Sequence, residues 1–434
     1  MSMMSMIFAG AAAASEDVMN DLKRAGIRRN PLKEYAPYLA HAMRTFLGFE
    51  MGTMEHIPTV VQILMPLMFM VIPFAFYGYT STLVGAINMA IAILACIGGI
   101  FLWVVFPSMS LTVRFLRPVL LEIFRPEKVL PRSLRKFPEA IRNIDRMQII
   151  GSAITSSGCI MALLYNMYYL IIREQNYEAG VNVLTFILGV ALLFGFHLCV
   201  TMASTWSLVC VLHEAELELL VLCWKQRSRH PLLETQLPQP LTLLDCLMLR
   251  LRLLGSQHME GEFLGRAAPF LIQSGESLGG GLVSIDVIIS SFHATRDSLE
   301  WSSSMVGSVV SIIVLFIFPL AAFLQGVSLF TQGSAYISTA AFPILYPLVF
   351  MAIIPALRVN LRWAAASEAM RAALSLYSET EQLRLLNIMT QYPMRFSMAG
   401  FTMTPMVFGI MLTPPIMGSL ACIIFVLAPS LTVT

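Results

Sequence analysis

Charged residues are scarce in this chain. Only 12% of its 434 residues are Asp, Glu, Lys or Arg, whereas 57% are apolar. Soluble globular proteins carry about twice that charged fraction. The composition therefore excludes an ordinary soluble domain and predicts a polytopic protein embedded in the lipid bilayer.

Sequence motifs for catalysis, nucleotide binding and metal binding are also missing. There is no Walker A sequence, no His-x-x-x-His pair and no Cys-rich metal spacing, and His197 stands alone in an apolar stretch. We therefore expect no enzyme activity, no cofactor and no metal site. Nothing indicates nucleic-acid readout, because membrane orientation and anionic lipid explain the basic loops.

Seven apolar segments are long enough to span a bilayer. They lie near residues 57–79, 83–106, 147–172, 181–212, 303–330, 336–357 and 402–431. With the N-terminus inside, every one of the 28 lysines and arginines except Arg173 falls in an inside segment, as the positive-inside rule requires. The predicted fold is an all-α membrane protein with seven transmembrane helices, a cytosolic N-terminus and an extracellular C-terminus. That orientation excludes a G-protein-coupled receptor, whose N-terminus lies outside.

Residues 263–292 form a weaker apolar stretch that competes for the role of an eighth span. It contains Arg266, Glu276 and Asp286, and each charge at a bilayer centre costs about 2.5–3.5 kcal/mol. An eighth span would also move the basic residues of 358–395 to the outside. We therefore expect this stretch to lie on the cytosolic side or at the membrane interface.

The predicted spans divide the chain into six parts. These are a cytosolic or interfacial N-terminal segment (1–56), the first four spans (57–212), a cytosolic loop with anchor helices (213–302), spans five and six (303–357), a cytosolic helix with the approach to the last span (358–401), and the last span (402–434). The fourth span ends near Leu212. We expect its continuation, residues 214–224, to be an amphipathic helix that projects beyond the membrane.

The last span is the candidate pore helix. It contains no charged residue, yet it is interrupted by Gly409, Pro414-Pro415 and Gly418-Ser419. Such interruptions free backbone groups that only a neighbouring helix or a wet cavity can satisfy. Its outer half carries a stripe at helical spacing that fits an apolar pore gate and ordinary helix packing equally well: Ser419, Ile423, Val426 and Leu427.

The sequence Phe396-Ser397-Met398-Ala399-Gly400-Phe401 leads into the last span, and Ser367-Glu368-Ala369 lies in the segment before it. The first resembles the Phe-x-Ala-x-Gly-Phe-like stretch that leads into the last helix of insect gustatory receptors and gustatory-receptor-like proteins, members of the insect chemoreceptor superfamily. The second is similar to their Asn-Glu-Ala segment. Where that family carries Thr-Tyr and then Gln-Phe, this chain has Gly418-Ser419 and then Phe425-Val426-Leu427. It therefore resembles a divergent member with a more hydrophobic gate.

The resemblance implies a ligand-gated, non-selective cation channel in the plasma membrane. It further implies a homotetramer whose central pore is lined by the last span of each subunit. The family's ligand pocket lies between spans and opens to the outside, and an aromatic cage suits a small, mostly uncharged molecule. The residues that this chain offers there, which an aromatic belt at the membrane interface also explains, are Tyr79, Tyr165, Asn166, Tyr169, Phe186 and Tyr336.

Two other functions stay open at this point. A secondary transporter or lipid-handling protein would use the prolines of the spans to break helices around a binding site, and internal repeats would favour it, but none is clear in the sequence. A non-conducting relative of the channel family would keep the fold without the pore.

Overall fold

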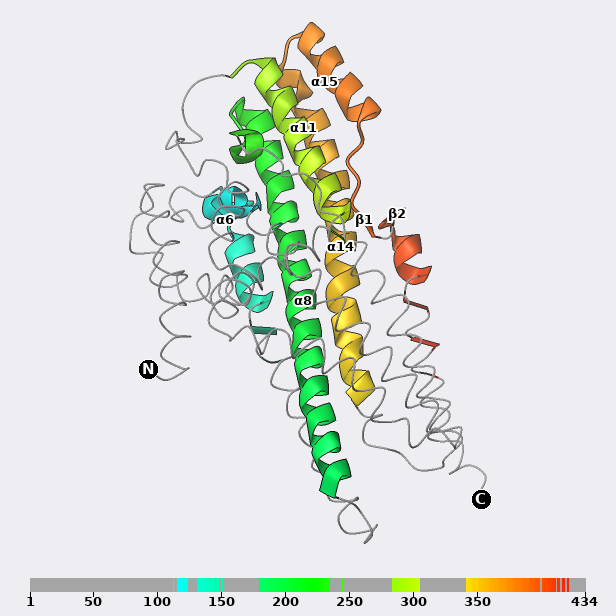
Figure 1. The fold of residues 1–434 in the computed structure, drawn as a ribbon. Helices are drawn as coiled ribbons and strands as arrows, with labels where there is room; N and C mark the ends of the chain where they lie inside the picture. Colours follow the sequence, from blue (N-terminus) through cyan, green and yellow to red (C-terminus); the bar gives the residue numbers. More distant parts are fainter. Residues whose placement is uncertain are drawn as a thin grey trace, which may run out of the picture.

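The computed structural model describes residues 112, 115–123, 131–144, 146–147, 150, 179–234, 244, 283–304, 341–398, 400–410, 412–413, 416–417 and 420. Two long helices form the axis of this part of the chain (Figure 1). Helix α8 (Ala179–Gln226) has 48 residues and helix α14 (Ala341–Ala372) has 32, which makes them about 72 Å and about 48 Å long. They pack against each other along their length. Their side chains are described from Ala203 and Ile353 onward.

Shorter elements gather around one end of this pair, where α8 ends (Figure 1). They are α6 (Arg117–Ile123), η3 (Pro231–Glu234), α11 (Ile285–Ser302), η7 (Ala373–Leu376) and α15 (Glu379–Gln391). A two-stranded antiparallel hairpin, β1 (Ser397–Met398) and β2 (Phe401–Thr402), follows α15. The described residues are therefore helical apart from this hairpin and short connections, in agreement with the predicted all-α class.

No helix offers a stretch long and apolar enough to cross a membrane, within the residues that the structure describes. Residues 181–212 lie in α8 and residues 341–357 lie in α14, so the fourth predicted span and most of the sixth are helical. The last predicted span is described only at its beginning. The remaining predicted spans lie almost entirely outside the described residues.

Helix α8 continues through residues 214–224, as predicted, and its projection beyond the membrane stays a prediction. All but two of these eleven residues are buried, and the buried set includes Glu214 and Glu216. The reason is that α6, α11, η7 and α14 all contact α8. A period of charged residues that looks like a solvated face in the sequence is enclosed by neighbouring helices.

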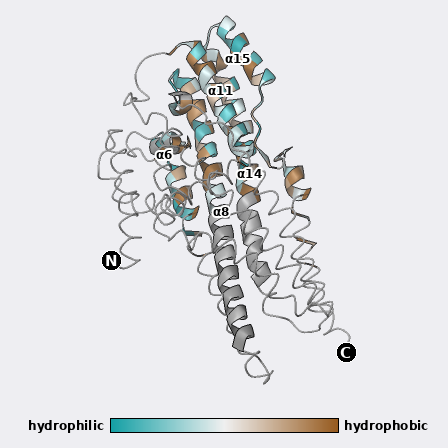
Figure 2. Ribbon diagram, in the orientation of Figure 1, coloured by the Kyte–Doolittle hydropathy of each residue, from teal (hydrophilic) through white to brown (hydrophobic). Residues whose placement is uncertain are grey.

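Helix α11 contacts α8 through a single face. Seven of its eight buried residues recur every three or four positions, which places them on one side of an α-helix: Ile288, Ser291, Phe292, Thr295, Ser298, Leu299 and Ser302. The eighth, Trp301, packs against Phe115. At the start of α11, Asp286 is exposed and pairs with Arg384 of α15 at 2.9 Å. Figure 2 shows hydrophilic and hydrophobic residues mixed along α11 and α15. Residues with hydroxyl groups thus make up four of the seven buried residues on this face of α11.

Candidate functional site at the hairpin before the last span

The residues predicted from the sequence to bind ligand or to gate a pore are almost all outside the described part of the chain. Phe186 belongs to α8, in the portion whose side chains are not described. The others are Tyr79, Tyr165, Asn166, Tyr169 and Tyr336 for the ligand, and Ser419, Ile423, Val426 and Leu427 for the gate. These assignments stay predictions. The structure describes instead the segment that leads into the candidate pore helix.

Residues 396–403, here called the approach hairpin, form a tight turn. Met398 pairs with Phe401 and Ser397 pairs with Thr402 across two short strands. Gly400 in the turn has φ +79°, a left-handed conformation that residues with a Cβ rarely adopt. The glycine of the sequence motif is therefore required by the backbone of the turn.

Asn360 of α14 holds both strands of the approach hairpin. Its Nδ2 group donates to the carbonyl oxygen of Phe396 at 2.8 Å and to that of Met403 at 2.9 Å. Its Oδ1 atom accepts the backbone N–H of Phe396 at 2.9 Å. The Met403 N–H closes the hairpin on the Phe396 carbonyl at 3.2 Å. One amide side chain thus uses two donors and one acceptor to fix the hairpin to α14.

The side chain of Phe396 anchors the hairpin to α8. It is fully buried, and its ring stacks on Trp206 with the ring centroids 5.3 Å apart. The imidazole of His213 lies on it at 5.6 Å and a tilt of 56°. Since Ser397 Oγ donates to Ser303 Oγ just after α11 at 3.4 Å, the approach hairpin is held where α8, α11 and α14 meet.

A helix begins directly after the hairpin, at residues 405–410. Thr404 caps it, because its Oγ1 atom accepts the backbone N–H of Val407 at 3.2 Å, and Pro405 occupies the first helical position, where proline is favoured. The outer face of this helix is apolar and exposed: Met406 is 76% exposed and Ile410 is 60% exposed. Figure 2 shows the same hydrophobic character in this short helix.

Ion pairs fix the register of α8 against α14. Glu214 and Glu218, one turn apart on α8, face Arg358 and Arg362, one turn apart on α14. Arg358 binds Glu214 at 3.1 Å, and Arg362 contacts Glu218. Burial raises the pKa of the Glu214 carboxyl, and the Arg358 guanidinium opposes that rise. Asn360 lies between the two arginines in the sequence, so these ion pairs flank the residue that holds the hairpin.

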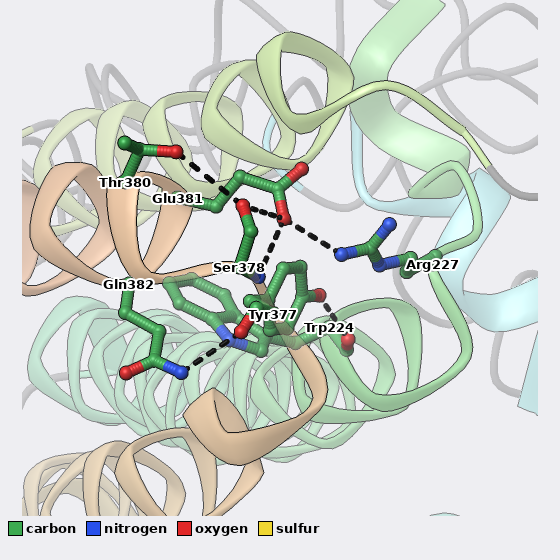
Figure 3. A network of polar contacts seen from close by, with 7 residues as sticks. All are labelled: Trp224, Arg227, Tyr377, Ser378, Thr380, Glu381 and Gln382. Carbon is green, nitrogen blue, oxygen red and sulfur yellow. Dashed lines mark hydrogen bonds and ion pairs between the residues drawn. The ribbon is translucent and has the colours of Figure 1, made fainter.

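A second polar network joins the end of α8 to the start of α15 (Figure 3). Arg227 Nη2 donates to Glu381 Oε2 at 2.8 Å, and its guanidinium lies 4.5 Å from the centroid of the Tyr377 ring. Ser378 donates its backbone N–H to the same carboxylate oxygen at 3.0 Å. The Tyr377 hydroxyl donates to the carbonyl of Trp224, and burial raises the pKa of Tyr377 to about 12.

Arg227 itself has φ +49°. Ser228 N–H donates to the Cys223 carbonyl at 3.0 Å, so α8 ends in a Schellman motif with an arginine where glycine is usual. The ion pair with Glu381 and the contact with Tyr377 compensate for this backbone conformation. Helix α15, and with it the approach hairpin, is therefore tied to the end of α8.

Sequence reasoning missed Asn360, Trp206 and His213 as members of one site. The only signal in the sequence was the spacing of Trp206 and His213, which are seven residues apart and so lie on the same side of a helix. As for metals, no group of three or more His, Cys, Asp or Glu among the described residues is placed to hold an ion.

Comparison with known proteins gives structural neighbours only. The sequence matches no protein-family model and no curated protein. The chain is similar to two solved structures of the insect olfactory receptor OR5 from Machilis hrabei, one of them in complex with eugenol. Both structures have 14% sequence identity to this chain and a TM-score of 0.49. The similarity to the structure without eugenol covers 82% of this chain and 87% of that chain. The similarity to the eugenol complex covers 84% of this chain and 90% of that chain.

Proposed function

We propose that this protein is a chemoreceptor-like, ligand-gated, non-selective cation channel of the plasma membrane. Four identical chains surround a central pore, which the last span of each chain lines. Ser419, Ile423, Val426 and Leu427 face the pore, and the three apolar side chains close it by excluding water. The pocket near Tyr165 and Tyr169 binds a small, mostly uncharged molecule.

The observation that carries the proposal is the placement of the sequence motif. Residues 396–401, which resemble the stretch before the last helix of gustatory receptors, form the tight approach hairpin. Asn360 ties that hairpin to α14, and Thr404 starts a helix directly after it. A pore-lining helix needs a defined point of attachment to the neighbouring helices. The approach hairpin provides this attachment for the last span.

Exposed apolar side chains support the association of several chains. The approach hairpin exposes Phe401 (61%), the described start of the last span exposes Met406 (76%), and α15 exposes Leu383 (64%). Large apolar side chains left exposed in this way are often covered by another protein surface or by lipid. One such helix cannot enclose a pore, so a closed symmetric ring is the arrangement that would complete it.

The test does not require the natural ligand. The purified protein is reconstituted in liposomes, and the flux of a small monovalent cation is measured for the wild type, Val426→Ser and Leu427→Ser. A hydroxyl in the constriction should wet it, so both variants should leak cations at least about tenfold faster than the wild type. The control is Ala421→Ser, which places the same side chain on the opposite side of the helix and should leave the flux unchanged.

The outcomes separate the candidate functions. Single-channel steps and fourfold particles would support the channel. Saturable solute flux without channel steps would favour a secondary transporter, and fourfold particles without flux in any variant would indicate a non-conducting relative. A monodisperse monomer that conducts nothing would overturn the proposal.

The ligand pocket has its own test. If Tyr165 and Tyr169 line it, their replacement by Ala should abolish the response to small aromatic and aliphatic molecules that activate the wild type. The leak of the Val426→Ser gate variant should survive these changes, because the pore is distinct from the pocket. Intact responses in both tyrosine variants would reject the pocket but leave the channel in place.

A further inference from the structure

A carboxyl group and an imidazole ring lie fully buried where α8 passes α11 and the approach hairpin. The side chains of His213 and Glu216 are each 0% exposed, and His213 Nδ1 lies 2.7 Å from Glu216 Oε2. Ser298 Oγ of α11 donates to the same carboxyl oxygen at 3.2 Å. The two remaining polar atoms of the pair, His213 Nε2 and Glu216 Oε1, are buried without a hydrogen-bond partner among the described residues.

The number of protons on this pair decides whether it is electrically balanced. With one proton, the pair is either neutral or a contact ion pair, and both forms keep the bond between Nδ1 and Oε2. With no proton, a carboxylate is buried beside a neutral ring. With two protons, an imidazolium is buried beside a neutral carboxyl. The last two states each leave an uncompensated buried charge, which is strongly destabilising.

The charged groups of the surrounding elements are engaged elsewhere. Arg358 and Arg362 of α14 and Lys136 bind Glu214 and Glu218, which lie on either side of Glu216 in the sequence. The other acidic, basic and imidazole side chains that the structure describes on these neighbouring elements are Glu122 of α6, His230 before η3, Asp286, His293, Arg296, Asp297 and Glu300 of α11, Glu368 and Arg371 of α14, Glu379, Glu381 and Arg384 of α15, and Arg395 before the hairpin.

Of these groups, His230 contacts Glu216, but at its backbone rather than at its carboxyl group. Its Nε2–H group donates to the Glu216 carbonyl oxygen at 3.3 Å. Arg296 pairs with Glu300 and Asp297 on α11, and Arg384 pairs with Asp286. Burial raises the pKa of the Glu216 carboxyl, and the hydrogen bonds from His213 and Ser298 oppose that rise.

The pair is in direct contact with the anchor of the approach hairpin. The His213 ring that bonds Glu216 on one side packs against the Phe396 ring at 5.6 Å. A rotation of His213, or water drawn in to solvate a buried charge, would displace Phe396 from its stack on Trp206. We propose that Glu216 and His213 form a buried proton site that keeps Phe396 seated when it holds one proton and releases the approach hairpin when it gains or loses one. This inference does not rest on channel function, because the hairpin can be observed directly.

The test measures hydrogen exchange of the backbone amides in residues 394–403, with the full-length protein in detergent, across a range of pH. Glu216→Gln keeps the size and the acceptor of the side chain but cannot ionise. His213→Gln removes the imidazole. The matched control is Glu379→Gln, which removes an exposed carboxylate of α15. Each variant is compared with the wild type at the same pH, so the intrinsic pH dependence of exchange cancels.

In the wild type, exchange in the hairpin should accelerate by at least about tenfold at both ends of the pH range relative to its minimum. Glu216→Gln should lose the alkaline acceleration and keep the acid one, because only His213 can still change charge. His213→Gln should do the reverse. Glu379→Gln should keep both.

Two outcomes would overturn the proposal. One is a wild-type hairpin whose protection does not change with pH beyond the intrinsic rate. The other is pH-dependent protection that Glu216→Gln and His213→Gln both leave intact. If one variant does not fold, the other still tests its own side of the profile, since each residue is assigned to one end of the pH range.

Discussion

Asn360 and Phe396 hydrogen-bond to each other in both directions. The amide nitrogen of Asn360 donates to the Phe396 carbonyl at 2.8 Å, and its amide oxygen accepts the Phe396 N–H at 2.9 Å. A third bond, to the Met403 carbonyl at 2.9 Å, reaches the other strand of the hairpin. Only an amide supplies two donors and an acceptor at this distance from the helix, so the residue type at 360 is fixed by the geometry of the hairpin.

Replacement of Asn360 should therefore loosen the approach hairpin. Asn360→Ala should lower the free energy of unfolding by about 1–3 kcal/mol, since it leaves backbone groups of the hairpin unsatisfied. Asn360→Asp should cost at least as much at neutral pH, because a carboxylate cannot donate to the two carbonyl oxygens. Thermal unfolding and hydrogen exchange of residues 394–403 measure both effects.

The control for this experiment is Asn387→Ala, which changes an exposed asparagine of α15. It should alter stability by no more than about 0.5 kcal/mol. If Asn360→Ala were as stable as Asn387→Ala and its hairpin equally protected, the three hydrogen bonds would not hold the hairpin to α14.

Two glycines near the last span should respond to alanine with opposite signs. Gly400 has φ +79° and Gly409 lies in the helix of residues 405–410, and a Cβ atom at either position meets nothing within 4 Å. Gly400→Ala should destabilise by about 1–2 kcal/mol through backbone strain alone. Gly409→Ala should stabilise by about 0.5–1 kcal/mol, because alanine favours the helix. Thermal unfolding of the two variants side by side checks this. Equal effects of the same sign would mean that the turn does not need its left-handed residue.

These positions show what the sequence could predict. Gly400 in a short motif, and Thr404-Pro405 before an apolar run, are local signals, since turns and helix starts depend on residues close together in the chain. The roles of Asn360 and Glu216 could not be predicted, because they arise only when α8, α11 and α14 come together. Asn360 stands 36 residues before the carbonyl of Phe396 to which it binds. The burial of Glu214 and Glu216 could not be predicted for the same reason, because whether a helix face is solvated depends on elements distant in sequence.

Arg227 tests the balance between backbone strain and side-chain contacts. Arg227→Ala and Arg227→Gly both lose the ion pair with Glu381 and the contact with the Tyr377 ring. Residue 227 keeps its positive φ in both variants, but this conformation is unfavourable only for alanine. Arg227→Gly should therefore be more stable than Arg227→Ala by about 1 kcal/mol. Chemical denaturation of the two variants gives the difference. If the two variants were equally stable, the positive φ at residue 227 would not be a source of backbone strain.

Because His230 is buried, we expect the folded protein to lose stability in acid. Its Nε2–H donates to the Glu216 carbonyl at 3.3 Å, and its Nδ1 atom accepts the Leu232 N–H at 3.2 Å. Burial lowers the pKa of His230 from 6.5 to about 4. The His230 imidazole therefore becomes protonated below about pH 6.5 in the unfolded chain, but only near pH 4 in the folded chain. The stability that the neutral ring contributes is fully present above pH 6.5 and is lost as the pH falls through this window.

The variant His230→Gln should be less stable at neutral pH, but its stability should decline less steeply between pH 6.5 and pH 4. The direct measurement is the titration of the imidazole resonances of the wild type by nuclear magnetic resonance. The resonance that disappears in His230→Gln should titrate near pH 4. If that resonance titrated near 6.5 instead, the ring would be open to water, and the turn between α8 and η3 would not be packed against Glu216 as the structure has it.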